Sequence, residues 1–329
     1  MPELPEVETL RRDLVRRLSG AELGALWTSG MPLRLGRPLD VVAITAVTVG
    51  HRVVELKRQA KYLLVYTSAG GALVVHLGMT GHLLVCKAAA PREPHTHLVW
   101  ALDRARELRY VDPRRFGQVT TVRRGEEAAL TELGILGIEP LGRALTTDRL
   151  ATLLAATARP LKAFLLDQSR VAGLGNIYVC EALFLAGLHP SLPSRAAVGR
   201  AAALRAAIRR VLSKGIANRG TTIRDYSDSS GRQGDNQHTL KVYGREGEPC
   251  IRCGTRIRRQ VDSARSSFFC PQCQPGPAAR PPKRAKRPKQ AKQAKQKQAR
   301  QARQSRQKRS IPAAARSKKQ RAKRRSGIR

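Results

Sequence analysis

Apolar and polar residues alternate in two different ways along this chain. In residues 5–18, Val7, Leu10, Leu14 and Leu18 recur at three- and four-residue spacing, which predicts a helix with one buried face. From about residue 41 to 122 the pattern changes to short β-branched runs, VVAITAVTV, YLLVYTS, ALVVHLG, HLVWAL and GQVTTV, separated by turn residues. Several strands without intervening helices predict an antiparallel sandwich or barrel.

Helical periodicity returns from about residue 126. The predicted helices are LTTDRLATLLAA, PLKAFLLDQ, NIYVCEALFLAG and SRAAVGRAAALRAAIRRVL. The chain becomes irregular after Gly220 and then enters a cysteine-rich module at 250–273. The pattern therefore indicates an α+β protein with a β-rich half, a helical half and a small metal module.

Charge is distributed unevenly over the 329 residues, whose formal net charge is +38. Residues 274–329 contain 22 Lys/Arg and no acidic residue, so the first 273 residues keep a net charge of +16. A balance this positive indicates a polyanionic partner, most commonly nucleic acid. The basic segment has only Ile311 and Ile328 as large apolar residues, so we expect it to be disordered. Its functional interpretation is a DNA-binding arm, and the alternative is a solvated extension.

Membrane insertion and secretion are not expected from this sequence. It contains no run of 18 or more apolar residues, which a membrane-spanning helix would need. The first ten residues, MPELPEVETL, carry three glutamates and no apolar core of a secretory signal.

Four cysteines form two closely spaced pairs, Cys250 with Cys253 and Cys270 with Cys273. The pattern C-x2-C-x16-C-x2-C is typical of a tetrahedral zinc site with four thiolate ligands. One structural zinc ion would then replace the hydrophobic core that so short a segment lacks. Unpaired or disulfide-bonded cysteines are the alternative.

A glycine-rich turn, residues 173–176, separates two of the predicted helices. Gly173 and Gly175 would let the backbone approach a ligand closely, and Asn176 would cap the second helix. Free N–H groups at that helix start would suit a DNA phosphate. An ordinary helical hairpin with a Gly-rich turn is the alternative.

The N-terminus offers a nucleophile. Pro2 is a small second residue of the kind that permits removal of Met1, which would expose a secondary amine able to condense with an aldehyde carbon. With a pKa near ~7.8 such an amine is roughly 10–15% neutral at pH 7, against about 0.04% for a lysine. Glu3 could act as general acid beside it. A chance Met-Pro-Glu start is the alternative.

Three further segments combine turn residues with side chains that can reach outward. Lys61 lies in RQAKYLLVY, amid a predicted strand that is otherwise apolar on both sides, where a snorkelling surface lysine is the simpler interpretation. HLGM at 76–79 and DPRRFG at 112–117 are similar cases. None of these segments identifies a function by itself.

Taken in order, these motifs resemble those of the formamidopyrimidine-DNA glycosylase family. The matching segments run from Pro2 to Gln274: PELPEVET, AKYL, HLGMTG, DPRRFG, LLDQ followed by GLGNIY, VYGREGEPC, and the finger CIRCG to FFCPQCQ. The resemblance implies an N-terminal helix and β-sandwich at 1–133, a helix–two-turn–helix domain at 134–245, a zinc finger at 246–274 and a tail at 275–329. DNA would lie between the first two.

The resemblance also implies roles for individual residues. Pro2 would be the nucleophile that attacks C1′ of the damaged nucleotide, with Glu3 as acid and Glu6 in support. Lys61 and Arg265 would complete the catalytic set. The implied DNA contacts are His76, Met79, His95, Arg114, Arg115, Phe116, Lys162, Asn176 and Tyr243, of which Met79, Arg114 and Phe116 would fill the hole left by the flipped base.

The implied activity is excision of oxidised purines, 8-oxoguanine and formamidopyrimidines, from double-stranded DNA, followed by β,δ-elimination at the abasic site. We expect a monomeric bacterial enzyme, cytoplasmic and nucleoid-associated. Residues 226–239, in the position of the lesion-recognition loop, are more polar than is usual in the family, which leaves the preferred lesion open. Alternatives are an endonuclease VIII-like enzyme for oxidised pyrimidines, disfavoured by Leu4, and a non-catalytic zinc-finger DNA-binding protein.

Overall fold

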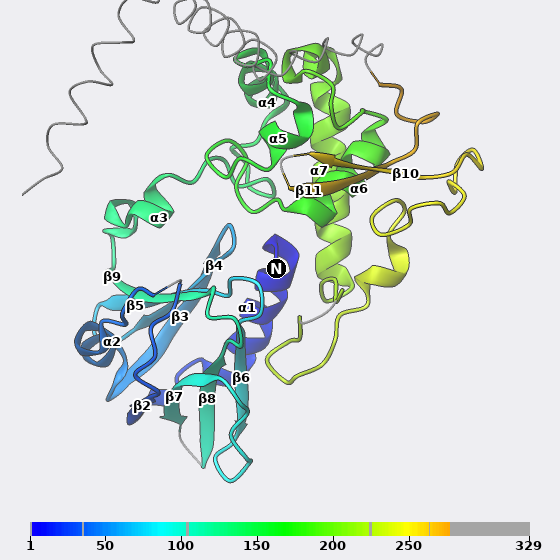
Figure 1. Ribbon diagram of the computed structural model, residues 1–329. Coiled ribbons are helices and arrows are strands. Elements are labelled where there is room, and N and C mark those ends of the chain that lie inside the picture. The colour runs from blue at the N-terminus through cyan, green and yellow to red at the C-terminus, as the bar shows by residue number, and fades with distance from the viewer. Residues whose placement is uncertain (1, 35, 103–104, 224–225, 263, 277–329) are drawn as a thin grey trace, which may run out of the picture. The chain divides into compact units, whose positions relative to one another are not determined.

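Helix α1, Leu4–Leu18, begins immediately after Glu3 and has Pro5 in its first turn. The computed structural model describes residues 2–34, 36–102, 105–223, 226–262 and 264–276 (Figure 1). The Glu6 carboxylate accepts the Glu3 N–H at 2.8 Å, which satisfies one of the unpaired donors of the helix start. The predicted apolar face of α1 is confirmed, since Val7, Leu10, Leu14 and Leu18 are all buried.

Two antiparallel sheets follow α1. One has the strand order β1-β3-β4-β5-β9 and the other β2-β7-β8-β6. The strands are β1 (Glu22–Leu23), β2 (Leu26–Thr28), β3 (His51–Gln59), β4 (Tyr62–Thr67), β5 (Gly71–His76), β6 (His82–Lys87), β7 (Thr96–Leu102), β8 (Arg106–Val111) and β9 (Gln118–Arg123). Alternate residues such as Leu63, Val65, Leu98 and Trp100 share one core with α1. The predicted sandwich is therefore confirmed.

The prediction of a strand at 41–49 is wrong. These residues form helix α2, Val41–Thr48, because the Asp40 side chain accepts the Ala43 N–H at 2.9 Å and caps the helix. Ile44 is buried in the sandwich core, whereas Val42 is 82% exposed. The cap at Asp40 thus outweighs the preference of the β-branched residues for a strand.

The helical half begins with η1 (Glu127–Ala129) and α3 (Thr131–Gly134), which lie against the outer face of the β4–β5 sheet through Leu133. Then come α4 (Thr147–Ala155), α5 (Leu161–Leu165), α6 (Asn176–Ala186), η2 (Ser194–Arg200), α7 (Ala201–Ala217) and η3 (Asn236–Thr239). The long helix predicted from residue 194 starts as a 3-10 helix and becomes α-helical only at Ala201.

Leu4 connects the two halves. It is fully buried in the hydrophobic core of α4–α7, whereas Val7 and Leu10, further along α1, belong to the sandwich core. The start of α1 is therefore packed into the helical half, and this fixes the position of Pro2 and Glu3.

The cysteine-rich module forms a two-stranded hairpin of β10 (Arg258–Asp262) and β11 (Arg265–Phe269). It packs on α6 through Cys180 and Phe184, which share a small core with Ile257. The predicted disordered tail at 275–329 lies, from residue 277 onward, outside the described residues.

Candidate active site

Glu3 lies at the N-terminus of α6. Its Oε1 accepts the Ile177 N–H at 2.9 Å, and its Oε2 lies 3.5 Å from the Tyr178 N. The expectation that Asn176 caps this helix is wrong, and Glu3 takes the Ile177 N–H at the helix start. Asn176 is already the first helical residue, and the carboxylate of Glu3, from the other end of the chain, occupies the place of an anion.

The glycine-rich turn is shaped for the N-terminus of the same chain. A Cβ at Gly175 would lie 2.3 Å from Cδ of Glu3. A Cβ at Gly173, whose φ is +90°, would lie 2.7 Å from the Leu4 side chain, and the Gly173 carbonyl accepts the Leu4 N–H. The close approach expected of these glycines is therefore to Leu4 and Glu3.

Glu6 fixes the position of Glu3 through hydrogen bonds. Its carboxylate accepts the Tyr178 hydroxyl at 2.7 Å, the Thr221 N–H at 2.7 Å and the Glu3 N–H at 2.8 Å. It is 1% exposed, and burial raises its pKa above the ordinary value. The Glu6 carboxylate thus binds donors from three segments of the chain and fixes the backbone at Pro2 and Glu3.

The electrostatics of the site keep a large share of Glu3 protonated at neutral pH. The pKa of Glu3 is raised to about 7, chiefly by burial; the positive charge of Lys61 opposes the shift, and the neighbouring Glu6 adds to it. Lys61 is 7% exposed; burial lowers the pKa of its ammonium, Arg265 lowers it too, and Glu3 opposes this. A carboxyl with a raised pKa beside an ammonium with a lowered pKa is a combination found often in catalytic sites.

Lys61 is positioned by a tight turn. The sequence suggested that it lies within a strand, but it follows Ala60, whose φ is +52°, between β3 and β4. The Ala60 N–H is bonded to the Glu139 carboxylate, which also pairs with Arg58 at 2.9 Å. The lysine is buried rather than directed to solvent, and its charge acts on the pKa of Glu3.

A cavity of about 210 Å³ brings together side chains from distant segments. Lys61, His76, Gln168 and Arg265 are among the residues that line it. Burial, assisted by Lys61, lowers the pKa of His76 to about 4, so His76 is neutral at pH 7. Two cations and a neutral imidazole form a site suited to a phosphate group.

Met79 and Arg114 project from two neighbouring turns. Met79 is 39% exposed, and the Arg114 guanidinium lies over the Phe116 ring at 4.5 Å. Arg115, in the same turn, has a φ of +53°. His95, also at positive φ, is exposed, and its carbonyl accepts the Asp112 N–H.

Lys162 and Asn176 contact the zinc hairpin. Lys162 is 3% exposed, and its Nζ donates to the Ser266 carbonyl at 2.7 Å and to Ser267 Oγ at 2.8 Å. Asn176 Nδ2 donates to the same carbonyl at 2.9 Å. These bonds hold the hairpin that carries Arg265. The predicted DNA contacts of Lys162 and Asn176 stay predictions.

Tyr243 is positioned by Glu181 of α6. The buried Glu181 carboxylate accepts the backbone N–H groups of Lys241, Val242 and Tyr243. The Tyr243 ring packs edge-on against Phe268 of β11, at 5.1 Å between centroids. Tyr243 therefore lies beside the zinc hairpin, at the end of a turn tied to α6.

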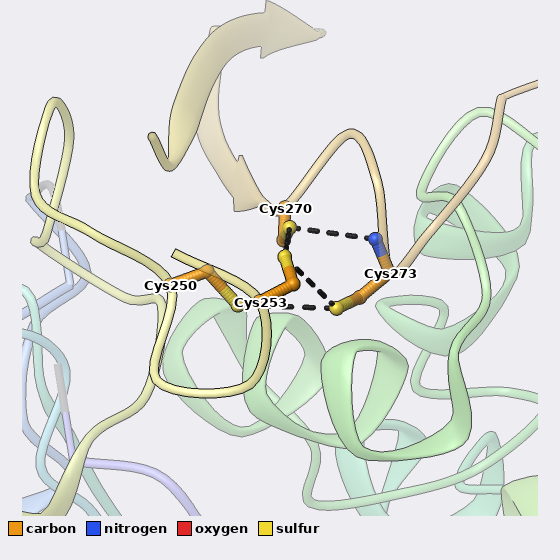
Figure 2. A group of neighbouring side chains, drawn as sticks. All are labelled: Cys250, Cys253, Cys270 and Cys273. Carbon is orange, nitrogen blue, oxygen red and sulfur yellow. Dashed lines mark hydrogen bonds between the residues drawn. The ribbon is translucent and has the colours of Figure 1, made fainter. Parts of the chain in front are cut away.

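The four cysteines converge on one point, as Figure 2 shows. Their Sγ atoms lie within 4.8 Å of one another, with separations of 3.9 Å for Cys250–Cys273 and 3.5 Å for Cys253–Cys270. A tetrahedral zinc ion with Zn–S bonds of about 2.3 Å requires Sγ atoms about 3.8 Å apart. The residues fit one structural zinc ion, as predicted, and a disulfide does not join them.

Several residues of the site were not predicted from sequence. Tyr178 and Thr221 hold Glu6, and Thr80 and Asp112 join the turns of Met79 and Arg114. The sequence motifs include Tyr178, Thr80 and Asp112, so these residues could have been identified as part of the site. Thr221 stands in none, and only the folded structure shows its contact.

Three family models match consecutive parts of the chain. The formamidopyrimidine-DNA glycosylase N-terminal domain matches residues 1–119, the helix–two-turn–helix domain of the same enzymes matches 136–227, and the zinc finger found in this enzyme and in isoleucyl-tRNA synthetase matches 247–276. Together with the buried Glu3 and the four-cysteine site, they define a zinc-finger DNA glycosylase.

Individual relatives extend over nearly the whole described part of the chain. The formamidopyrimidine-DNA glycosylase of Herpetosiphon aurantiacus is 46% identical over 275 residues, which are 83% of this chain and 100% of the relative. That of Moorella thermoacetica is 47% identical over 260 residues, 79% and 94% of the two chains. The chain belongs to the formamidopyrimidine-DNA glycosylase family. It is a base-excision repair DNA glycosylase with abasic-site lyase activity.

Solved structures show the same fold. The Thermus thermophilus MutM (Fpg) protein matches with a TM-score of 0.74 and 40% identity, over 84% of this chain and 100% of that one. Lactococcus lactis Fpg bound to DNA with an abasic site matches with a TM-score of 0.76 and 32% identity, over 83% and 100%. Within the described residues, none of the helices is long and apolar enough to cross a membrane.

Proposed function

We propose that Pro2, after removal of Met1, is the nucleophile of this enzyme and that oxidised purines in duplex DNA are its substrates. The Pro2 nitrogen forms a bond to C1′, the glycosidic bond breaks, and the base leaves with a proton. Opening of the sugar ring gives an iminium, which acidifies the C2′ proton. Loss of that proton expels the 3′ phosphate by β-elimination, a second elimination expels the 5′ phosphate, and hydrolysis of the iminium releases Pro2.

The observation that carries this proposal is the environment of Glu3. Its buried carboxyl is bonded to the α6 N-terminus next to Pro2, and burial raises its pKa to about 7. A group with this pKa is protonated in about half of the molecules at pH 7 and can give its proton to the sugar oxygen. Glu6 supports it through the Glu3 N–H.

We assign DNA contacts to the remaining predicted residues. Lys61, His76 and Arg265, which line one cavity, would bind the phosphates beside the lesion, with Lys162, Asn176 and Tyr243 next to the hairpin. Met79, Arg114 and Phe116 would fill the space of the flipped base, with Arg115 and His95 nearby. Flipping costs a few kcal/mol, which an apolar wedge and a hydrogen-bonding fork can offset.

Covalent trapping tests the proposed nucleophile. Borohydride reduces the iminium, so a stable adduct should form on duplex DNA containing 8-oxoguanine opposite cytosine, and mass spectrometry should locate it on Pro2. Pro2→Gly, or protein that retains Met1, should form no adduct. Glu3→Gln should lose base excision but still be trapped on a preformed abasic site. Normal trapping by the Met1-containing protein would contradict the role of Pro2.

A second candidate substrate class is oxidised pyrimidines. Lactococcus lactis Fpg, which has a TM-score of 0.76 with this chain, has been solved with DNA containing an oxidised pyrimidine. In this chain the polar segment 226–239 lies near Glu6, since the Tyr226 hydroxyl donates to the Glu6 carbonyl at 3.2 Å. Comparing excision of 8-oxoguanine with thymine glycol separates the two classes.

We also propose a setting for the enzyme. It acts as a monomer on the DNA of a bacterial cytoplasm, associated with the nucleoid, which is consistent with its bacterial relatives. Its functional units are residues 1–133, 134–245, 246–274 and the tail 275–329. Sedimentation of the full chain with and without lesion DNA tests the monomer.

A further inference from the structure

A second concave site lies apart from the cavity of Lys61 and His76. It is a cavity of about 180 Å³ between α6, α7, η3 and the first turn of the zinc module. Its lining includes Tyr178 and the apolar side chains of Phe184, Leu185, Val211, Leu240 and Ile251. A dry apolar cavity of about 150 Å³ can bind benzene. The space therefore suits one aromatic or large aliphatic side chain.

Ile251 lines this cavity and is also partly exposed to solvent. It lies in the turn between Cys250 and Cys253, which Figure 2 shows, and it is 53% exposed. An exposed isoleucine in a metal-held turn is rigidly displayed, because the cysteines on both sides are ligands. An apolar side chain beside a concave apolar wall is typical of a binding site.

Four basic residues also line the cavity, namely Arg210, Lys214, Lys241 and Arg252. In the described part of the chain, neither Arg210 nor Lys214 forms an ion pair, and both are exposed. The Arg252 guanidinium is fixed, since it donates to the Phe184 and Leu185 carbonyls at 3.0 and 3.3 Å and lies 4.3 Å from the Phe184 ring. The lining of the cavity thus carries four positive charges.

Glu181, the one acidic residue of the lining, offsets only one of these four charges. Glu181 is 6% exposed, and its carboxylate already accepts the N–H groups of Lys241, Val242 and Tyr243. These neutral donors hold the carboxylate in place, and its single negative charge leaves the lining with a net charge of +3. A ligand in the cavity would meet this net positive charge.

The apolar part of the cavity lies away from the proposed chemistry, whereas Tyr178, which also lines the cavity, donates its hydroxyl to the Glu6 carboxylate. Glu3 is bonded to Ile177 in the first turn of α6, whereas Leu185 lies eight residues further along the same helix. At 1.5 Å per residue this is about 12 Å along the helix axis. A ligand near Leu185 and Ile251 would leave the Glu3 site open.

We propose that this cavity is the docking site for an acidic peptide segment of a partner protein, which inserts one aromatic or large aliphatic side chain. The flanking carboxylates would pair with Arg210, Lys214, Lys241 and Arg252, and the apolar group would pack on Ile251 and Leu240. The protein's own residues 274–329 are unsuited to this site, because they carry 22 Lys/Arg and no acidic residue. Duplex DNA offers negative charge but no apolar group to fill the cavity.

Fluorescence anisotropy of the full-length protein with labelled Gly-Asp-Asp-Phe-Asp-Asp-Gly tests the proposal. We expect saturable binding that weakens at least tenfold in Ile251→Asp and in the pair Arg210→Glu, Lys214→Glu. A peptide with alanine in place of phenylalanine should also bind at least tenfold more weakly. Since the basic C-terminal segment attracts any acidic peptide, the difference between variants measures the cavity itself.

The pair Arg143→Glu, Arg149→Glu is the matched control, since it makes the same charge change on exposed arginines outside the cavity. It should change peptide affinity less than twofold. Equal binding by all variants, or by the alanine peptide, would show attraction by charge alone and overturn the proposal. Loss of duplex affinity in the Arg210, Lys214 pair beyond the loss in the control would instead make this a DNA site and also overturn it.

Discussion

Thr80 Oγ1 donates to the Asp112 carboxylate at 2.6 Å, and this bond joins the two turns that carry Met79 and Arg114. Thr80 Oγ1 also accepts the Arg114 N–H at 3.2 Å, so one hydroxyl bridges both turns. Asp112 is fully buried and accepts the Gly117 N–H at 2.7 Å as well. The two halves of the proposed wedge are therefore held as one unit.

Thr80→Val should separate the two turns without changing the volume of the side chain. Loss of a hydrogen bond to a buried carboxylate costs about 1.5–3 kcal/mol. We expect single-turnover excision to slow about tenfold, with zinc content unchanged. Thr96→Val is the control, because Thr96 is also a buried threonine whose hydroxyl bonds a backbone carbonyl, that of Glu93. Equal excision by the two variants would show that the bridge is dispensable.

Glu3→Gln should change how stability depends on pH. The pKa of Glu3 is raised from 4.5 to about 7 in the folded protein, so the carboxyl binds its proton more tightly when folded. The wild type is therefore stabilised below pH 4.5 and loses this contribution as pH rises to 7. Relative to Glu3→Gln, it should lose on the order of 3 kcal/mol over this range. Urea unfolding at pH 4.5, 6 and 7.5 measures the difference, and parallel pH curves would contradict the raised pKa.

Gly175→Ala should displace Glu3 from the start of α6. The added Cβ would lie 2.3 Å from Cδ of Glu3, so the carboxyl must move or the helix must shift. We expect about 1–3 kcal/mol of destabilisation and a loss of excision of at least a hundredfold. Gly199→Ala makes the same change where no atom lies within 4 Å, and it should excise normally. A fully active Gly175→Ala enzyme would remove the basis for Glu3 as the acid.

Local patterns predicted most of the fold. The helix of Val7, Leu10, Leu14 and Leu18 and the strands of the sandwich have a clear period, and each buries the face that the period indicates. Residues 41–49 were predicted as a strand because β-branched residues favour strands. They form a helix because Asp40 caps its start.

The site was predicted less completely than the fold. Motifs indicated Pro2, Glu3 and Lys61, and cysteine spacing indicated the zinc ligands. The sequence could not show that Gly175 makes room for Glu3, because the two residues are 172 positions apart and only tertiary packing brings them together. For the same reason the bonds from Lys162 to Ser266 were not foreseen.

Removal of zinc should release the hairpin that carries Arg265. The four thiolates hold β10 and β11 against α6, and the hairpin has few apolar residues of its own. We expect a chelator, or Cys253→Ala, to abolish binding of lesion DNA while the helical and β-sandwich parts stay folded, as measured by circular dichroism and gel shift. Cys86→Ala, which changes a cysteine outside the metal site, should bind normally. Lesion binding that survives complete loss of zinc would contradict the role of the finger.

Truncation after Gly276 should weaken nonspecific DNA binding and spare the chemistry. The 22 Lys/Arg of the C-terminal segment can each neutralise a phosphate, and each contact adds about 0.9 to the slope of log K against log salt. The truncated protein should therefore bind undamaged duplex more weakly at low salt, with a shallower slope, yet cut saturating lesion DNA at the same single-turnover rate. A full-length control with glutamine at these basic positions separates charge from length, and it should behave like the truncated protein. Because Glu3, Lys61 and the zinc site all lie before residue 276, a many-fold slower cut by the truncated enzyme would show that the segment is more than a tether.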